Sequence, residues 1–117
     1  MNFERWSIWK ANLDPIIGSE QRKTRPVFII SDSKINKILP VVNILPITSR
    51  KNKRRVYPNE TLISESKFGL EKESIVLCYP IRTIDKQRLI QNYGIIDDNL
   101  KQSEIIDALT FQLGTAK

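Results

Sequence analysis

Short, β-branched apolar runs, interrupted by proline and polar residues, limit the folds open to this chain more than any other feature. The clearest runs are VFII at 27–30 and IVLC at 75–78, and each has the length of a buried strand. A membrane-spanning helix needs about 20 consecutive apolar residues, and no stretch of the sequence approaches that length. The pattern therefore predicts a small, mainly β fold.

Strands are expected wherever such runs occur, in the segments 5–13, 26–31, 41–48 and 74–79, with a possible extension at 81–84. The segment 56–63 is expected to pair back across a basic tip at 50–55. Pro46 favours an edge or a bulge in its strand, and Phe68-Gly69-Leu70 indicates a turn. The segment 32–39 is compatible with a helical turn or with a strand extension.

The C-terminal segment has the pattern of a helix. Asp97 and Asp98 supply an N-cap and negative charge in the first turn, and Gly114 suits the C-terminal end. Apolar residues recur at helical spacing in between, at Leu100, Ile105, Ile106, Leu109 and Leu113. Together the elements predict one domain over 1–117, a strongly bent barrel of short strands with helical turns and a terminal helix.

Composition excludes several kinds of chemistry. The chain has no histidine, which excludes Ser-His-Asp and Cys-His catalysis, and with one cysteine a structural zinc site is not expected. The single Cys78 cannot form an internal disulfide, and no secretory signal is evident, so we expect a reducing cytoplasm. No glycine-rich phosphate loop occurs.

Positive charge is concentrated in the first half of the chain. Residues 1–55 contain 12 basic and 4 acidic residues, whereas residues 56–117 contain 7 basic and 9 acidic residues. Such an excess suits a polyanionic partner such as a nucleic acid, although a merely soluble basic protein has the same composition.

Three strings carry a family resemblance: LDPIIGSEQRKTRPV at 13–27, PITS at 46–49 and SIVLCYPIRTIDKQRL at 74–89. In this order and spacing they resemble the MazF/PemK toxin endoribonucleases of toxin–antitoxin systems. The resemblance implies an SH3-like β-barrel of five to seven strands, a homodimer, and a cognate antitoxin whose disordered acidic segment blocks the site. It also implies sequence-specific cleavage of single-stranded RNA, often mRNA, without a metal or other cofactor, by attack of the 2′-hydroxyl on the adjacent phosphate.

The resemblance also implies site residues. The family pattern places the catalytic arginine at Arg25 and the catalytic threonine at Thr48. RNA-binding residues are expected in the loop that contains Ser19, Glu20, Gln21 and Lys23, and at Arg50, which begins a basic run that could gather phosphates.

The chemistry of these residue types is consistent with such a role. A guanidinium is always charged and binds phosphate oxygens through two hydrogen bonds, so Arg25 could stabilise the transition state, and the Thr48 hydroxyl could hydrogen-bond the phosphate or the 2′-hydroxyl. The Arg25 guanidinium stays protonated near neutral pH and therefore cannot serve as the base. The proton acceptor stays open between Thr48 acting through water, Glu20 and Tyr79. On residue type alone, Arg25 is equally compatible with a structural ion pair and Thr48 with a β-branched filler.

Four positions depart from the family pattern. Leu77 and Tyr79 stand where some relatives carry an arginine and an acid, Pro80 stands where many have glutamine, and Trp6 replaces the usual glycine of the first strand. Trp6 and Trp9 are three residues apart, so on a strand they face opposite sides, and one of them is expected in the core. The departures at Leu77 and Tyr79 keep a non-catalytic RNA-binding barrel open as an alternative. A second alternative is a gyrase poison like CcdB, whose family shares the barrel and the dimer.

Overall fold

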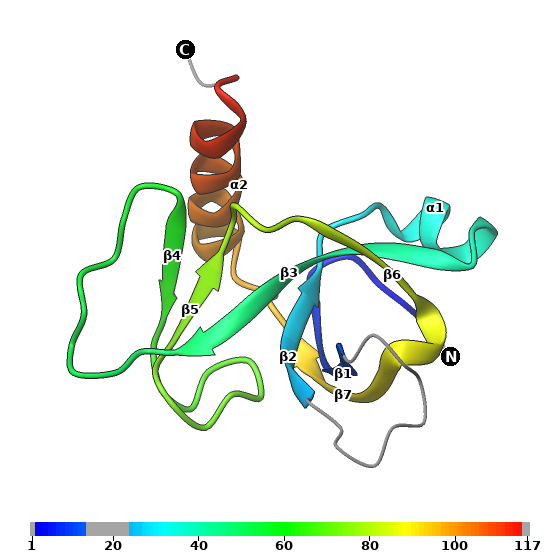
Figure 1. Cartoon of the computed structure of the whole chain (residues 1–117), viewed down its shortest axis with the longest axis horizontal. Helices are drawn as coiled ribbons and strands as arrows, with labels where there is room; N and C mark the ends of the chain where they lie inside the picture. The colour runs from blue at the N-terminus through cyan, green and yellow to red at the C-terminus, as the bar shows by residue number, and fades with distance from the viewer. Residues whose placement is uncertain (1, 14–23, 116–117) are drawn as a thin grey trace.

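The computed structural model describes residues 2–13 and 24–115 of the chain (Figure 1). It is a mainly β structure with a C-terminal helix, as predicted. The strands are β1 (Ser7–Asn12), β2 (Thr24–Ile29), β3 (Val41–Ser49), β4 (Glu60–Ile63), β5 (Ser74–Leu77), β6 (Arg82–Asp85) and β7 (Leu89–Ile95). The helices are α1 (Ser33–Ile38), the 3-10 turn η1 (Lys86–Arg88) and α2 (Asn99–Leu113).

The strands form one antiparallel sheet in the order β4-β5-β3-β2-β1-β7, with β6 paired to β3 beside this path. Within the described residues no ladder joins β4 to β7, so the predicted barrel is not closed by strand pairing. The sheet instead bends strongly around the central strand β3, which runs through the middle of the molecule in Figure 1.

Strand β3 changes partner halfway along its length. Residues 41–44 pair with β6 and residues 47–49 pair with β5, whereas β2 lies along the other side. Pro46 falls at the change of partner, where its missing N–H is tolerated. Of the edge or bulge predicted at Pro46, the edge is wrong, because β3 is central and buried over most of its length.

Both faces of the sheet are covered by apolar side chains. One core contains Phe28, Leu45 and Ile47 together with Ile105 and Ala108 of α2, and the other contains Trp9, Val27, Ile29 and Ile44 with other residues of β1, β3, β6 and β7. Successive residues of β2 and β3 alternate between the two cores, as the period of a strand requires. A residue of these strands that belongs to one core therefore has sequence neighbours that face the other.

Helix α1 resolves the alternative left open for 32–39. Asp32 caps it, since its carboxylate accepts a hydrogen bond from the Lys34 N–H, and Asn36, within the helix, is buried. The Asn36 amide donates to the carbonyls of Phe3 and Ser31, at 2.8 and 3.0 Å. These bonds favour a helical turn over a strand extension.

Helix α2 has the predicted caps but buries less of its apolar stripe than expected. The Asp98 carboxylate accepts hydrogen bonds from the N–H groups of Leu100 and Lys101, and Gly114 ends the helix in the left-handed region. Only Ile105 and Ala108 are buried, because α2 rests on β4 along part of its length. Leu100, Phe111 and Leu113 are each more than half exposed.

Two strand predictions are corrected by the pairing. The segment 56–63 contributes only β4, and β4 pairs with β5, which separates it from β3. Residues 81–84 do not extend β5 but belong to the separate strand β6. Strand β7 was not predicted at all.

Candidate functional site

Arg25 and Thr48, predicted from different strings, come to neighbouring strands. The β2–β3 ladder ends at the pair of Val27 with Pro46, and Arg25 and Thr48 each lie two residues beyond that last pair. Because side chains alternate along a strand, Arg25 shares a face with Val27 and Thr48 shares a face with Pro46. The two predicted residues therefore lie at adjacent ends of the neighbouring strands β2 and β3, on corresponding faces.

Arg25 is exposed near the start of β2. In the described part of the chain its guanidinium has no hydrogen-bond or ion-pair partner. The following Pro26 restricts Arg25 to an extended backbone, which directs the start of its side chain. An unengaged, exposed guanidinium is suited to bind a phosphate group through two parallel hydrogen bonds.

Thr48 is half-buried, and strand β5, on the side of β3 away from β2, gives it an apolar neighbour. It pairs with Ile75 of β5, and Leu77 continues the same face of β5 two residues further on. Leu77 is 9% exposed, so an apolar side chain occupies this position, whereas Tyr79 beyond the strand is 52% exposed. The proton-transfer group that some relatives have in this strand is thus absent at Leu77.

The other predicted RNA-binding residues fall into two groups. Ser19, Glu20, Gln21 and Lys23 lie outside the described residues, so their role stays a prediction. Arg50 is described, and its guanidinium is already engaged: Nε donates to the Arg54 carbonyl at 2.8 Å and Nη1 lies 3.3 Å from a Glu73 carboxylate oxygen. These contacts tie Arg50 to the loop and to the segment before β5, and its binding of RNA stays a prediction.

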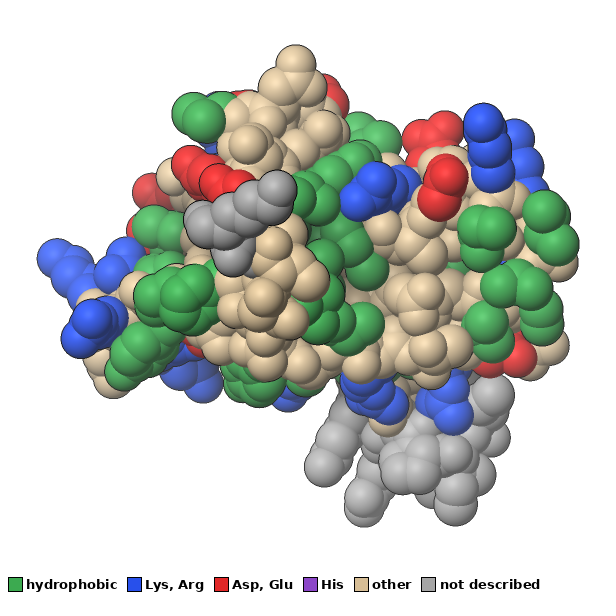
Figure 2. Space-filling view, turned by 90° about the horizontal axis from the view of Figure 1, so that it is seen from above, with side chains coloured by type: hydrophobic (Ala, Val, Ile, Leu, Met, Phe, Trp, Pro, Cys, Tyr) green, Lys and Arg blue, Asp and Glu red, His purple; other side chains and the backbone are tan. Residues whose placement is uncertain are grey.

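Residues 50–59, which join β3 to β4, form a basic loop. Figure 2 shows Lys and Arg side chains gathered at the end of the molecule where this loop lies in Figure 1. Lys51, Lys53 and Arg55 are exposed, and the Arg55 guanidinium lies over the Tyr57 ring at 5.3 Å from its centroid. The loop therefore presents cations and an aromatic ring to solvent.

The basic loop is closed at its base by Arg54 and Glu60. Two hydrogen bonds join the guanidinium to the carboxylate, at 3.0 and 2.8 Å, and the Tyr57 N–H donates a third at 3.0 Å. The hydrogen bonds from Arg54, with that from the Tyr57 backbone, lower the pKa of Glu60 against the opposing effect of burial. The hydrogen bond to Glu60 correspondingly raises the pKa of Arg54.

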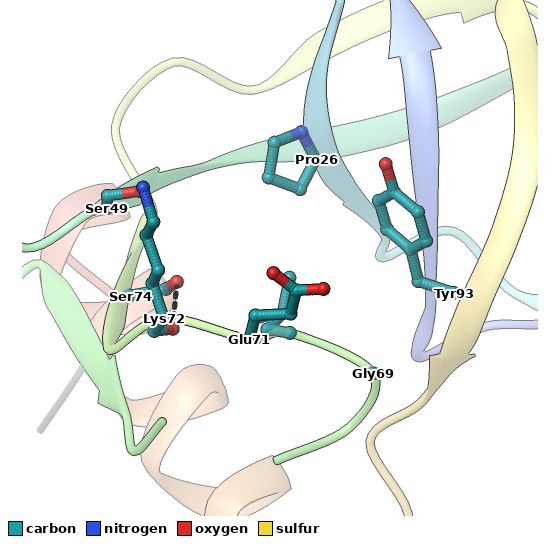
Figure 3. Close-up of a pocket in the computed structure, with 8 residues that line it drawn as sticks. Pro26, Ser49, Gly69, Glu71, Lys72, Ser74 and Tyr93 are labelled. Carbon is teal, nitrogen blue, oxygen red and sulfur yellow. Dashed lines mark hydrogen bonds between the residues drawn. The ribbon is translucent and has the colours of Figure 1, made fainter. Parts of the chain in front are cut away.

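A hollow of about 300 Å³ opens beside the ends of β2 and β3 (Figure 3). Two of its lining residues, Pro26 and Ser49, directly follow Arg25 and Thr48 in the sequence. Its remaining lining comes from the segment before β5 and from β5 and β7: Gly69, Leu70, Glu71, Lys72, Ser74 and Tyr93. The hollow thus adjoins the strand ends that carry the predicted catalytic residues.

Sequence reasoning did not find the residues of this hollow. It interpreted 68–70 only as a turn, and it did not place Tyr93 in a strand. The one usable signal was the Glu71-Lys72 pair directly after the turn, but the sequence does not indicate that β7 lies against it.

The two tryptophans differ as expected in their burial. Trp9 is 2% exposed in the core, and its indole N–H donates to the Ser7 hydroxyl at 2.8 Å. Trp6 is half-buried and stacks on Phe28 at 5.8 Å between ring centroids. Its φ is +75°, a left-handed conformation that favours glycine, which is the usual residue of the family pattern at this position.

Two features are absent from the described residues. Residues 2–13 and 24–115 contain no group of three or more His, Cys, Asp or Glu side chains placed to hold a metal ion. In the same part of the chain, no helix combines the length and apolar character that crossing a membrane requires.

Comparison with known proteins identifies relatives along nearly the whole chain. Residues 4–111 match the family model described as the PemK-like, MazF-like toxin of type II toxin–antitoxin systems. The chain is 39% identical over 110 residues to Endoribonuclease MazF of Staphylococcus saprophyticus, covering 94% of this chain and 90% of that protein.

Solved structures show the same fold. An endoribonuclease in complex with its cognate antitoxin from Mycobacterial species superposes with a TM-score of 0.78, at 21% identity and with 97% of each chain covered. A MazE–MazF complex from Deinococcus radiodurans superposes with a TM-score of 0.73, also at 21% identity and 97% coverage of each chain.

Proposed function

The chain belongs to the PemK-like, MazF-like toxin family of type II toxin–antitoxin systems, and from this premise we propose how it acts as an endoribonuclease. The observation that carries the proposal is the 39% identity to Endoribonuclease MazF over nearly the full length of both proteins. It is supported by the position of Arg25 and Thr48 at adjacent ends of the neighbouring strands β2 and β3.

The proposed reaction cuts single-stranded RNA without a metal ion. The 2′-hydroxyl of one nucleotide loses its proton and its oxygen attacks the adjacent phosphorus, and the bond to the 5′-oxygen breaks. That oxygen leaves with a proton, so the products are a 2′,3′-cyclic phosphate and a free 5′-hydroxyl.

In this reaction Arg25 would bind the non-bridging phosphate oxygens, on which negative charge increases in the transition state. A fixed donor of this kind typically lowers the activation free energy by about 3–4 kcal/mol. Thr48 would position the phosphate or the 2′-hydroxyl through its own hydroxyl. The cations of the basic loop, Lys51, Lys53 and Arg55, would hold neighbouring phosphates by screened attraction.

The test is cleavage of a long transcript by the purified protein in the presence of EDTA. We expect defined fragments whose new 5′ ends accept phosphate from polynucleotide kinase without prior dephosphorylation. The Arg25→Ala variant should lose cleavage by about 100-fold or more. RNA binding without cleavage by the wild-type protein, or full cleavage by Arg25→Ala, would contradict the proposal.

We further propose that the protein forms a homodimer. Helix α2 exposes Leu100, Phe111 and Leu113, a set of large apolar side chains that association would cover. Light scattering after size-exclusion chromatography should give twice the chain mass of 13.6 kDa, and a mass of one chain at micromolar concentration would contradict the dimer.

We also propose that a cognate antitoxin with a disordered acidic segment neutralises the protein. The excess of basic residues in the first half of the chain would attract such a segment, which becomes ordered on binding. The affinity should therefore fall as salt rises, and an affinity that does not change with salt would show that apolar contacts dominate.

A further inference from the structure

The hollow beside the strand ends has walls from four separate parts of the fold. Pro26 comes from β2, Ser49 from β3, Tyr93 from β7, and Glu71 and Lys72 from the segment between β4 and β5. In Figure 3 the Glu71 carboxylate and the Tyr93 ring point into the space between them, and Lys72 lies along the opposite wall from Tyr93. The arrangement is a concave site rather than a surface crease.

The wall that carries Glu71 is fixed by direct contact between two backbones. A β-carbon at Gly69 would lie 2.0 Å from the Tyr93 carbonyl oxygen, and one at Gly94 would lie 2.7 Å from the Phe68 carbonyl oxygen. Gly69 also has φ +85°, which suits glycine. These contacts, with burial of Leu70, hold residues 66–72 against β7.

Several polar groups in the hollow have no partner. Among the described residues, the Glu71 carboxylate, the Tyr93 hydroxyl and the Lys72 ammonium make no hydrogen bond or ion pair, whereas the Ser74 hydroxyl donates to the Lys72 carbonyl at 2.8 Å. An unpaired, exposed carboxylate beside an aromatic ring and a proline ring is suited to a planar ligand that carries hydrogen-bond donors on its edge.

We propose that this hollow receives one nucleobase of the RNA substrate, with guanine preferred. Guanine offers adjacent N1–H and N2–H donors, which match the two oxygens of the Glu71 carboxylate, while Tyr93 and Pro26 contact its faces. Uracil places a carbonyl oxygen on each side of its single N–H, and both would be repelled by the carboxylate. The inference rests on the proposed endoribonuclease function and adds a determinant of sequence preference to it.

The position of the hollow indicates which nucleotide it reads. Pro26 and Ser49 alternate with Arg25 and Thr48, so they face the other side of the sheet. An RNA strand that crosses the ends of β2 and β3 would present the scissile phosphate to one side and a flanking base to the other. The base in the hollow therefore belongs to a nucleotide next to, or one removed from, the scissile phosphate.

The experiment compares cleavage sites across a random-sequence RNA pool. The 5′-hydroxyl fragments made by the wild-type protein and by Glu71→Gln are sequenced, with Glu65→Gln as the matched control, since Glu65 is an exposed turn carboxylate that does not line the hollow. We expect the wild type to favour guanine at one position near the cut. Glu71→Gln should reduce that preference by about tenfold, and Glu65→Gln should leave it unchanged.

A binding measurement separates this inference from the proposed function. Short RNAs with a 2′-O-methyl group at the cut site, which cannot be cleaved, carry guanine or uracil at the chosen position. The wild type should bind the guanine RNA about tenfold more tightly, and Glu71→Gln should not distinguish the two. Absence of cleavage by the wild type overturns the proposed function. If the wild type cleaves and Glu71→Gln keeps the same guanine preference, only the proposal that the hollow binds guanine is overturned. Wild-type cleavage without any guanine preference likewise overturns only the proposal that the hollow binds guanine.

Discussion

Arg54 and Glu60 form a two-pronged ion pair at the base of the basic loop. The Glu60 side chain is 6% exposed and the Arg54 side chain is 36% exposed, so the pair is buried on its acidic side only. Besides the guanidinium, the Glu60 carboxylate accepts the Tyr57 N–H. One carboxylate therefore organises the turn through which the chain enters β4.

Replacing Glu60 with glutamine should lower the free energy of unfolding by about 1–2 kcal/mol. The value lies below the range for a fully buried pair because water screens the exposed side of Arg54. Urea denaturation measures it, with Glu104→Gln as the control, since Glu104 pairs with Lys101 at the surface and its loss should cost less than about 1 kcal/mol. Equal effects of the two substitutions would contradict a special role for Glu60.

The stabilisation by Glu60 should disappear in acid. Its pKa in the folded protein is lowered from an ordinary value of 4.5, so its contribution is fully present above about pH 4.5 and is lost as the pH falls through the lower folded value. The difference in stability between the wild type and Glu60→Gln should therefore shrink as the pH falls below 4.5. A difference that is constant from pH 7 to pH 3 would show that the carboxylate charge is not responsible.

Trp6 should respond to substitution in an unusual order. Both Trp6→Ala and Trp6→Gly remove the ring that stacks on Phe28, but only glycine relieves the left-handed backbone at φ +75°. The Gly variant should therefore be more stable than the Ala variant by about 1 kcal/mol, although glycine is usually the more destabilising residue. Thermal unfolding of both variants checks this, and a more stable Ala variant would show that the backbone is not strained.

Thr48 can be tested by separating its hydroxyl from its shape. Thr48→Val keeps the β-branched side chain next to Ile75 and should lower the RNA cleavage rate by about 100-fold or more. Thr48→Ser keeps the hydroxyl and should retain activity within about tenfold. If Thr48 only fills space, the Thr48→Val variant will stay active and the Thr48→Ser variant will mainly lose stability. The unfolding free energies of both variants will show this.

Cys78 should be protected from thiol reagents in the folded protein. Its side chain is fully buried, and burial raises the pKa of the thiol to about 12, so almost no thiolate exists near neutral pH. Labelling with iodoacetamide at pH 8 should be slower than in the urea-unfolded protein by about 100-fold or more. Rapid labelling of the folded protein would mean that the strand around Cys78 opens readily.

The sequence predicts the elements that bury an apolar face and misses those that depend on a distant partner. The runs at 27–30 and 75–78 are strands because both their faces are covered. Strand β7 exposes most of its residues and buries only Leu89, so its formation depends on pairing with β1, which the local pattern does not show. The apolar stripe of α2 was overestimated for a related reason, since periodicity does not tell how much of a helix finds a surface to cover.

The same distinction holds for the candidate site. Arg25 and Thr48 were predicted because each belongs to a recognisable string, and the structure puts them on the neighbouring strands β2 and β3. Glu71 and Tyr93 belong to no string that the sequence analysis used, and they meet only because the glycines 69 and 94 let two backbones touch. Local chemistry was predictable, whereas the neighbourhood created by folding was not.

Main-chain contact, together with the apolar side chains of Phe68 and Leu70, holds the 66–72 segment in place. Glu71 and Lys72 are consequently free to vary with little effect on folding. A library randomised at these two positions would stay folded while sampling many chemistries around one hollow, which makes this segment a practical starting point for retargeting the protein to new RNA sequences.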